Sequence, residues 1–122
     1  MEGRDPVSQI PPGKLRCIVT GKLRNDTPEE NVRQRIARSL MDDYGYDRVD
    51  IEIEFTVNLG RSKKRVDIAI FPSEAPHKQE NIGIVVECKS ENVRPTDRDN
   101  GVEQLKSYLS ARVSRFMTSR DI

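Results

Sequence analysis

The sequence predicts a single α/β domain in which a mixed β-sheet is flanked by helices. Two observations predict this class: hydrophobic residues recur with a helical or a strand period, and the segments follow the order helix, three strands, helix, strand. The length agrees, because 122 residues form one modest core and exclude a large multidomain enzyme. We expect residues 1–14 to form a loose polar lead-in and residues 15–122 to form the domain.

The first helix is expected over residues 28–41. Thr27 is suited to cap its N-terminus, Pro28 to occupy the first helical position, and Glu30 to complete a capping box three residues after the cap. Its buried face is expected to consist of apolar residues spaced four apart: Val32, Ile36 and Leu40.

Three strands are expected next. Residues 49–57 alternate between apolar and polar side chains, and a turn at residues 58–61 joins them in a hairpin to residues 65–71. Within each strand the apolar residues would share one face: Ile51, Ile53, Phe55 and Val57 in the first, and Val66, Ile68 and Ile70 in the second. Residues 82–89 are apolar on both faces, so we expect them to form the buried central strand.

Two elements are expected after the central strand. A polar loop leads to a second helix over about residues 101–112, and a last short strand is expected at about Arg115–Thr118. The inward stripe of this helix would consist of Val102, Leu105 and Leu109.

Composition excludes several classes of protein. Hydrophobic and charged residues each make up 34% of the chain, and no apolar run approaches the roughly 18 residues of a membrane helix. We therefore expect a soluble, cytoplasmic protein without membrane contact. Cys17 and Cys88 lie far apart and outside any Cys/His cluster, which indicates neither a disulfide framework nor a zinc site. The net charge of +1 means that a nucleic-acid surface would have to come from local clustering of basic residues.

Three charged residues interrupt the apolar strands and mark a candidate site. Glu87 and Lys89 lie two residues apart in the central strand, so they share a face, with backbone positions roughly 6–7 Å apart. Asp67 is a lone acid in the strand that we place beside it. Burial of such charges is unfavourable by several kcal/mol unless they are paired or bind a metal.

Two interpretations of these residues are open. In the first, Asp67 and Glu87 bind Mg²⁺ together, water and substrate phosphate fill its other positions, and Lys89 orients the water and stabilises developing negative charge. Such a site would cleave phosphodiester bonds. In the second, Glu87 and Lys89 form a structural ion pair and Asp67 is merely an acid at a strand end.

The order of these motifs resembles that of the PD-(D/E)xK nuclease superfamily and, within it, the N-terminal nuclease domain of type I restriction enzyme R subunits. The resemblance covers about residues 18–119. It is carried by Thr27-Pro28-Glu29-Glu30 with Arg33-Gln34, Arg65-Val66-Asp67-Ile68, Val85-Val86-Glu87-Cys88-Lys89, and Gln104 with Tyr108. Glu-x-Lys alone is weakly specific, whereas four motifs in order are fairly specific. The proline of the superfamily's name is replaced by Val66.

The resemblance implies a restriction-endonuclease-like core and magnesium-dependent cleavage of double-stranded DNA, with Mn²⁺ as a substitute for Mg²⁺. It implies that Asp67 and Glu87 are metal ligands, that the backbone carbonyl of Cys88 is a further ligand, and that Lys89 is the catalytic lysine. It also implies a translocase domain and other subunits of a restriction complex as partners. Because 122 residues cannot hold the translocase, the isolated domain is expected to show weak activity or none.

The first helix usually contributes an acid to sites of this kind, and two glutamates are candidates. At about 100° per residue, Glu29 falls beside Ile36 in angle, on the face turned toward the sheet. We therefore expect Glu29 to reach the metal through water and Glu30 to serve the capping box. Interaction with the helix dipole is the alternative role for Glu29.

The second helix and the loops contribute further candidates. Gln104 and Tyr108 lie one turn apart, and the resemblance places them next to the active site, where Gln104 would bind a phosphate or position Lys89. The alternative for this pair is a helix flank that faces solvent. Basic residues that would either contact phosphates or remain solvated are Lys63, Lys64, Arg65, Arg94 and Arg98.

The sequence therefore favours a magnesium-dependent DNA endonuclease domain. The main alternative is a non-catalytic nucleic-acid-binding or structural module that retains the nuclease fold. A nucleotide-processing α/β enzyme is disfavoured, because the chain contains neither a GxxxxGK[ST] nor a GxGxxG loop.

Overall fold

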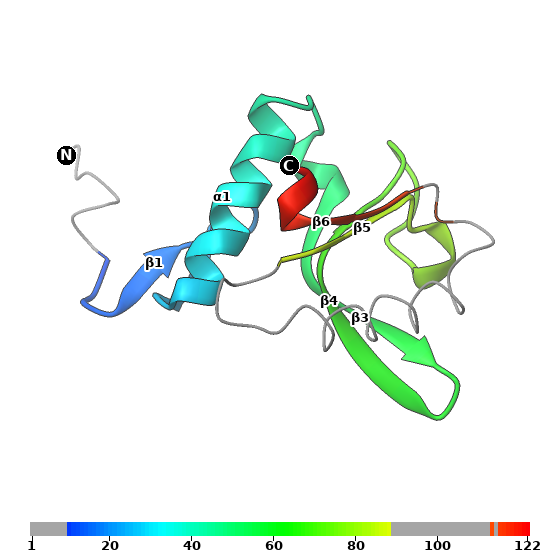
Figure 1. Cartoon of the computed structure of the whole chain (residues 1–122), viewed down its shortest axis with the longest axis horizontal. Coiled ribbons are helices and arrows are strands. Elements are labelled where there is room, and N and C mark those ends of the chain that lie inside the picture. Colours follow the sequence, from blue (N-terminus) through cyan, green and yellow to red (C-terminus); the bar gives the residue numbers. More distant parts are fainter. Residues whose placement is uncertain (1–9, 89–112, 114) are drawn as a thin grey trace.

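The protein combines a short antiparallel ribbon, one helix and a four-stranded mixed sheet (Figure 1). The structure, a computed structural model, describes residues 10–88, 113 and 115–122. The elements are β1 (Lys14–Arg16), β2 (Leu23–Asn25), α1 (Pro28–Asp42), β3 (Ile51–Leu59), β4 (Ser62–Ile70), β5 (Ile84–Glu87) and β6 (Arg115–Thr118), with short 3₁₀ turns at Arg48–Asp50, Gln79–Asn81 and Ser119–Asp121. The predicted α/β class is confirmed. The second predicted helix, over residues 101–112, lies outside the described residues.

Helix α1 begins and ends close to the predicted residues. Thr27 is the N-cap, and its hydroxyl oxygen accepts a hydrogen bond of 3.1 Å from the backbone N–H of Glu30. Pro28 occupies the first turn, where its missing N–H is not needed. The helix ends at Asp42, one residue later than expected, where the N–H of Asp43 still bonds to the carbonyl of Ser39.

Strands β3 and β4 form the predicted hairpin, in register from Ile51 opposite Ile70 to Leu59 opposite Ser62. A two-residue turn joins them, with Gly60 at a φ of 68°. Glycine adopts this left-handed conformation without the steric penalty of a Cβ atom, which favours a tight hairpin here.

Strand β5 lies inside the sheet, as predicted. All four of its residues are buried. It pairs antiparallel with β4 and parallel with β6, so the sheet is mixed, in the order β3-β4-β5-β6. The final strand, Arg115–Thr118, has the predicted bounds.

Two apolar clusters cover opposite faces of the sheet. The first, which we call the α1 cluster, joins the helix to the sheet and contains Ile36, Ala37, Leu40, Ile51, Ile68, Ile70, Ile84, Val86, Cys88 and Met117. The second contains Val57, Leu59, Val66, Ala69, Phe71, Ile82 and Val85. The first three residues of β5, Ile84, Val85 and Val86, alternate between the two clusters, as expected for a strand covered on both faces.

Halfway along the hairpin, the apolar side chains change from the face of the α1 cluster to the face of the second cluster. Ile53 packs against the α1 cluster, whereas Phe55 packs against the second cluster. In β4, Val66 belongs to the second cluster and Ile68 to the α1 cluster. The expectation that each strand keeps its apolar residues on one face is therefore wrong.

The change of side coincides with a distortion of β3 at Glu54. This residue has a φ of 56°, a conformation that non-glycine residues rarely adopt. The register places Glu54 opposite Asp67, but the ladder contains no pair at this position. A left-handed residue inside a strand reorients the chain beyond it, which accounts for the reversal of the apolar stripe in β3.

The N-terminal ribbon of β1 and β2 was not predicted. Lys14 pairs with Asn25 and Arg16 with Leu23. The backbone N–H of Ile18 donates a bond of 2.8 Å to the side chain of Gln34, which attaches the ribbon to α1. No helix within the described part of the chain is long and apolar enough to cross a membrane.

Candidate active site

Asp67 and Glu87 face each other across neighbouring strands. In the register of β4 and β5, Ile68 lies opposite Val86, so the next pair along the two strands is Asp67 and Glu87. Directly opposed residues of an antiparallel pair share a face, with Cβ atoms about 4.5–5.5 Å apart. Continued by one residue, this register brings the two acids together at the end of β5.

Each of the two carboxylates is held by the backbone of the opposite strand. The backbone N–H of Asp67 donates a 2.9 Å bond to Oε2 of Glu87. The backbone N–H of Cys88 donates a 2.8 Å bond to Oδ2 of Asp67. Hydrogen bonds to ionised acceptors are stronger than neutral ones, so these two contacts fix both carboxylates in place at the end of β5.

The environment of the two acids differs. The side chain of Glu87 is only 8% exposed, whereas that of Asp67 is 30% exposed. Burial, followed by the neighbouring charge of Asp67, raises the pKa of Glu87 despite the hydrogen bond from the Asp67 backbone and the charge of Lys64. The ammonium group of Lys64 lies 3.2 Å from Oε1 of Glu87. A further positive charge at this point would relieve the repulsion between the carboxylates.

The acid that α1 turns inward is Glu30. Glu30 is 4% exposed, whereas Glu29 is exposed to solvent. The expectation that Glu29 faces the sheet and that Glu30 closes a capping box is therefore wrong. Both residues lie close to the buried face of the helix in angle. In the first turn, however, it is Arg24 of β2 that covers the helix, and Arg24 lies on the side of Glu30.

The carboxylate of Glu30 is fully engaged by side chains. Its Oε1 accepts bonds of 2.8 Å from Arg24 and 2.7 Å from Arg33, and its Oε2 accepts a bond of 2.8 Å from Gln34. Burial alone would raise the pKa of Glu30, but the hydrogen bonds from Gln34, Arg24 and Arg33 together lower it. Glu30 therefore remains ionised.

Arg33 joins the helix to the two acids of the hairpin. Its side chain is 10% exposed, and besides Glu30 it lies 3.6 Å from Glu54 and 3.7 Å from Oδ1 of Asp67. Glu54 also pairs with Arg24 and lies 3.6 Å from Arg65. Although burial opposes the shift, these cations lower the pKa of Glu54. One network of alternating charge thus connects α1, the ribbon and the distorted position of β3.

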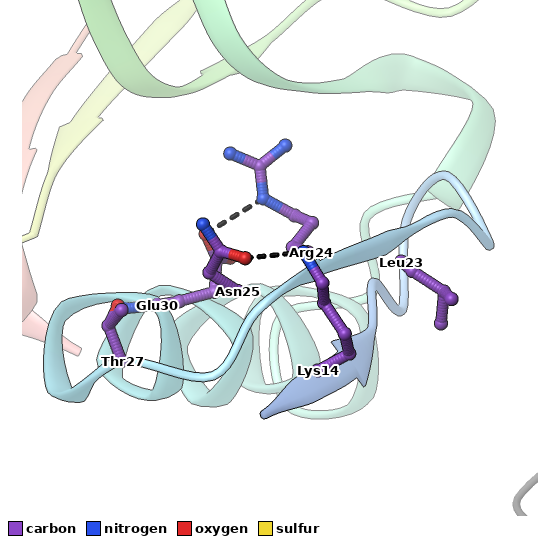
Figure 2. A pocket seen from close by; sticks show the side chains of 6 residues that line it. All are labelled: Lys14, Leu23, Arg24, Asn25, Thr27 and Glu30. Atoms are coloured by element: carbon purple, nitrogen blue, oxygen red, sulfur yellow. Dashed lines mark hydrogen bonds and ion pairs between the residues drawn. The ribbon is translucent and has the colours of Figure 1, made fainter. Parts of the chain in front are cut away.

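A cavity of about 390 Å³ lies beside this network, between the ribbon and the start of α1 (Figure 2). Its lining residues are Lys14, Leu23, Arg24, Asn25, Thr27 and Glu30. Figure 2 shows Arg24 reaching from β2 to the carboxylate of Glu30, while Lys14 bonds to Asn25 at 2.6 Å. Both cations of the cavity therefore have anionic or polar partners within it.

The donor set of Asp67 and Glu87 is compatible with magnesium. Mg²⁺ is often held in proteins by one or two carboxylates and completes its shell with water and substrate phosphate. Within residues 10–88, 113 and 115–122, no group of three or more His, Cys, Asp and Glu side chains could hold a metal ion, so the site offers a two-carboxylate set. The predicted roles of Lys89, Gln104 and Tyr108 concern residues outside the described part of the chain.

Sequence reasoning missed Arg24 and Glu54 as residues of this site, and it named Lys64 only as a candidate phosphate contact and not as a partner of Glu87. Glu54 could have been found by counting back from the hairpin turn, since a two-residue loop at Gly60 pairs Glu54 with Asp67. Arg24 and Lys64 carry no such signal. Their roles depend on the ribbon and on the length of a lysine side chain, which periodicity does not reveal.

Comparison with known proteins identifies the family. Residues 28–119, well over half of the chain, match the family described as the type I restriction enzyme R protein N terminus (HSDR_N). The chain belongs to this family. No curated protein and no solved structure gave a match.

The segment matched by the R protein N-terminus family includes α1 and all four strands of the main sheet. It therefore contains Asp67, Glu87, Arg33 and Glu54. The ribbon of β1 and β2 precedes the matched segment, so Arg24 reaches the site from outside it. The family agrees with the resemblance inferred from the motifs.

Proposed function

We propose that this chain is a magnesium-dependent DNA endonuclease domain of the restriction type. The observation that carries the proposal is the opposition of Asp67 and Glu87 on neighbouring strands, each anchored by the backbone of the other strand. Membership in a restriction enzyme R protein family supports DNA as the substrate. Double-stranded DNA, a translocase domain and restriction-complex subunits are the partners proposed with this role.

Asp67 and Glu87 would hold the cation, with Mn²⁺ able to replace Mg²⁺, and the carbonyl of Cys88 is proposed as a further ligand. The bound ion would supply electrostatic stabilisation of the charge that develops on the scissile phosphate. Two carboxylates leave open positions for substrate, as catalysis requires.

The other residues would orient the water and the substrate and would stabilise negative charge. Lys89 is proposed to orient the attacking water and stabilise negative charge, and Gln104 to bind phosphate or position Lys89. Glu30, in place of Glu29, acts through Arg33, which lies 3.7 Å from Asp67, and is therefore a positioning residue.

The test measures nicking of supercoiled plasmid by the full chain with MgCl₂, with MnCl₂ and with EDTA. We expect slow nicking, detectable at high protein concentration, with either cation and none with EDTA. Asp67→Asn, Glu87→Gln and Lys89→Ala should each abolish nicking while the circular dichroism spectrum stays native. Lys78→Ala, a change at an exposed loop residue, is the matched control and should nick at the wild-type rate.

A structural or non-catalytic DNA-binding module is the second candidate. It is favoured by the cations already beside each acid, Lys64 at Glu87 and Arg33 at Asp67. Under this alternative the chain would bind no Mn²⁺ in calorimetry and would leave plasmid intact at every protein concentration. Nicking that survives Glu87→Gln would also contradict the proposed active site, because a contaminating nuclease would then explain the cleavage.

A further inference from the structure

Lys64 forms an ion pair with the oxygen of Glu87 that a metal cation would bind. Oε2 of Glu87 is tied to the backbone N–H of Asp67 at 2.9 Å, whereas Oε1 lies 3.2 Å from the ammonium group of Lys64. A divalent ion that binds Oε1 would meet this ammonium group at a few Å. Two cations at that separation repel each other strongly where the surroundings are partly buried.

Lys64 is the more easily displaced of the two cations beside the acids. Its side chain is 31% exposed, and Glu87 is its ion-pair partner. Arg33, by contrast, is 10% exposed and lies within ion-pair distance of Glu30, Glu54 and Asp67. A lysine ammonium on a flexible four-carbon stem is strongly hydrated and moves at low energetic expense.

Lys64 belongs to the most basic stretch of the described chain. Four of the five residues from 61 to 65 are Arg or Lys, and no acidic residue occurs between residues 55 and 66. These residues lie at and beside the turn of the hairpin, which Figure 1 shows projecting beyond the rest of the sheet. A phosphate backbone laid along this hairpin would offer Lys64 a second anionic partner.

We propose that Lys64 couples cation binding to DNA binding: a divalent cation at Glu87 displaces the ammonium group, which then binds a DNA backbone phosphate. This inference rests on the proposed function, because it assumes a cation at Glu87 and DNA at the hairpin. The coupling is reciprocal, so DNA strengthens cation binding by the factor by which the cation strengthens DNA binding.

The experiment compares Lys64→Gln with Lys63→Gln in the full chain. The two variants lose the same charge from adjacent positions of β4, but their side chains point to opposite faces, and Lys63 is exposed. Calorimetry with MnCl₂ gives the cation affinity, with Glu87→Gln identifying the site. Fluorescence anisotropy of a labelled 20-base-pair duplex, with and without saturating Mn²⁺ at 4 °C and with strand integrity checked on a gel, gives the DNA affinity.

We expect Lys64→Gln to bind Mn²⁺ about fivefold more tightly than wild type, the factor typical of a lost ion pair at this exposure. The ratio of DNA affinities with and without Mn²⁺ should fall by about the same factor. Lys63→Gln should weaken DNA binding equally with and without Mn²⁺ and should leave the affinity for Mn²⁺ unchanged.

The outcomes separate this inference from the proposed function. If wild type binds Mn²⁺ at Glu87 but Lys64→Gln has the wild-type affinity and ratio, the coupling is refuted and the metal site stands. Equal effects of both lysine variants would also refute it, because a general charge effect would then suffice. If neither wild type nor Lys64→Gln binds Mn²⁺, the proposed metal site and the coupling fall together.

Discussion

Replacement of Glu30 by Gln tests the charge network directly. The change keeps the shape of the side chain but places an amide where two arginines and Gln34 donate. An amide oxygen at the position of Oε1 can still accept from both arginines, but the amide NH₂ group then faces the donors of Gln34 and Arg33. The negative charge that the two guanidinium groups share is also lost, in a position that is 4% exposed. Glu29→Gln is the matched control, because Glu29 lies in the same first turn and is exposed.

The size of the effect follows from the hydrogen bonds and ion pairs that the substitution removes. Hydrogen bonds to charged groups contribute about 1.5–3 kcal/mol, and removal of one partner of a buried ion pair destabilises by about 3–5 kcal/mol. Arg33 retains Glu54 and Asp67, so we expect the lower end, about 3 kcal/mol. The control should lose no more than about 1 kcal/mol, since it changes only the interaction with the helix dipole.

Urea unfolding at pH 7, followed by circular dichroism, measures both variants. Because the pKa of Glu30 is lowered in the folded protein, its contribution is complete above its ordinary value of 4.5 and is lost as the pH falls through the folded value. The gap between wild type and Glu30→Gln should therefore close in acid. Equal losses for the two glutamate variants at pH 7 would refute the reasoning.

Three further changes test other positions. Glu87→Gln should raise the melting temperature at pH 7, because burial and the charge of Asp67 raise the pKa of Glu87, so its ionisation opposes folding. The gain should disappear in thermal scans below pH 4.5, the ordinary pKa of a glutamate, where the carboxyl is protonated in both the folded and the unfolded state. Glu74→Gly should stabilise by about 0.5–1 kcal/mol in urea unfolding, since exposed Glu74 has a φ of 68°, and a loss of stability would contradict this. His77→Ala should destabilise by about 1 kcal/mol, because it removes a ring stacked on Phe71 at 4.2 Å; unchanged urea midpoints would show the stack to be unimportant.

Much of the fold could be predicted because its signals are local. Thr27 and Pro28 start α1 where expected, and the apolar run of the third strand corresponds to a strand in which every residue is buried. The hairpin follows from alternation and a glycine turn. The ribbon was missed because strands of three residues are too short to show a period.

The failures arise where tertiary contacts override a local pattern. A prediction from alternation requires every second side chain of a strand to lie on the same face. In β3 the side chains change faces at Glu54, which has a left-handed conformation that its residue type does not predict. The choice between Glu29 and Glu30 depended on what covers the first turn of α1. That cover is Arg24, which lies before the helix in the chain and beside it in space.

The candidate site was predicted in outline because charges are conspicuous inside apolar strands. Asp67 and Glu87 interrupt such runs, and the register brings them face to face. The surrounding cations were not paired with these acids, since Arg and Lys are common on exposed surfaces and their partners emerge only from the packed structure. Arg33 appeared in a motif, but its contacts with Glu30, Glu54 and Asp67 could not be inferred from spacing.

The ribbon has a practical meaning for where this protein can be shortened. The family match begins at Pro28, which is the natural place to trim the chain when a minimal fragment is designed. Such trimming would delete Arg24 and leave Glu30 and Glu54 each short of a guanidinium group. A fragment that begins at Pro28 would thus interrupt the charge network. A fragment that also keeps the ribbon of β1 and β2 is the sounder choice.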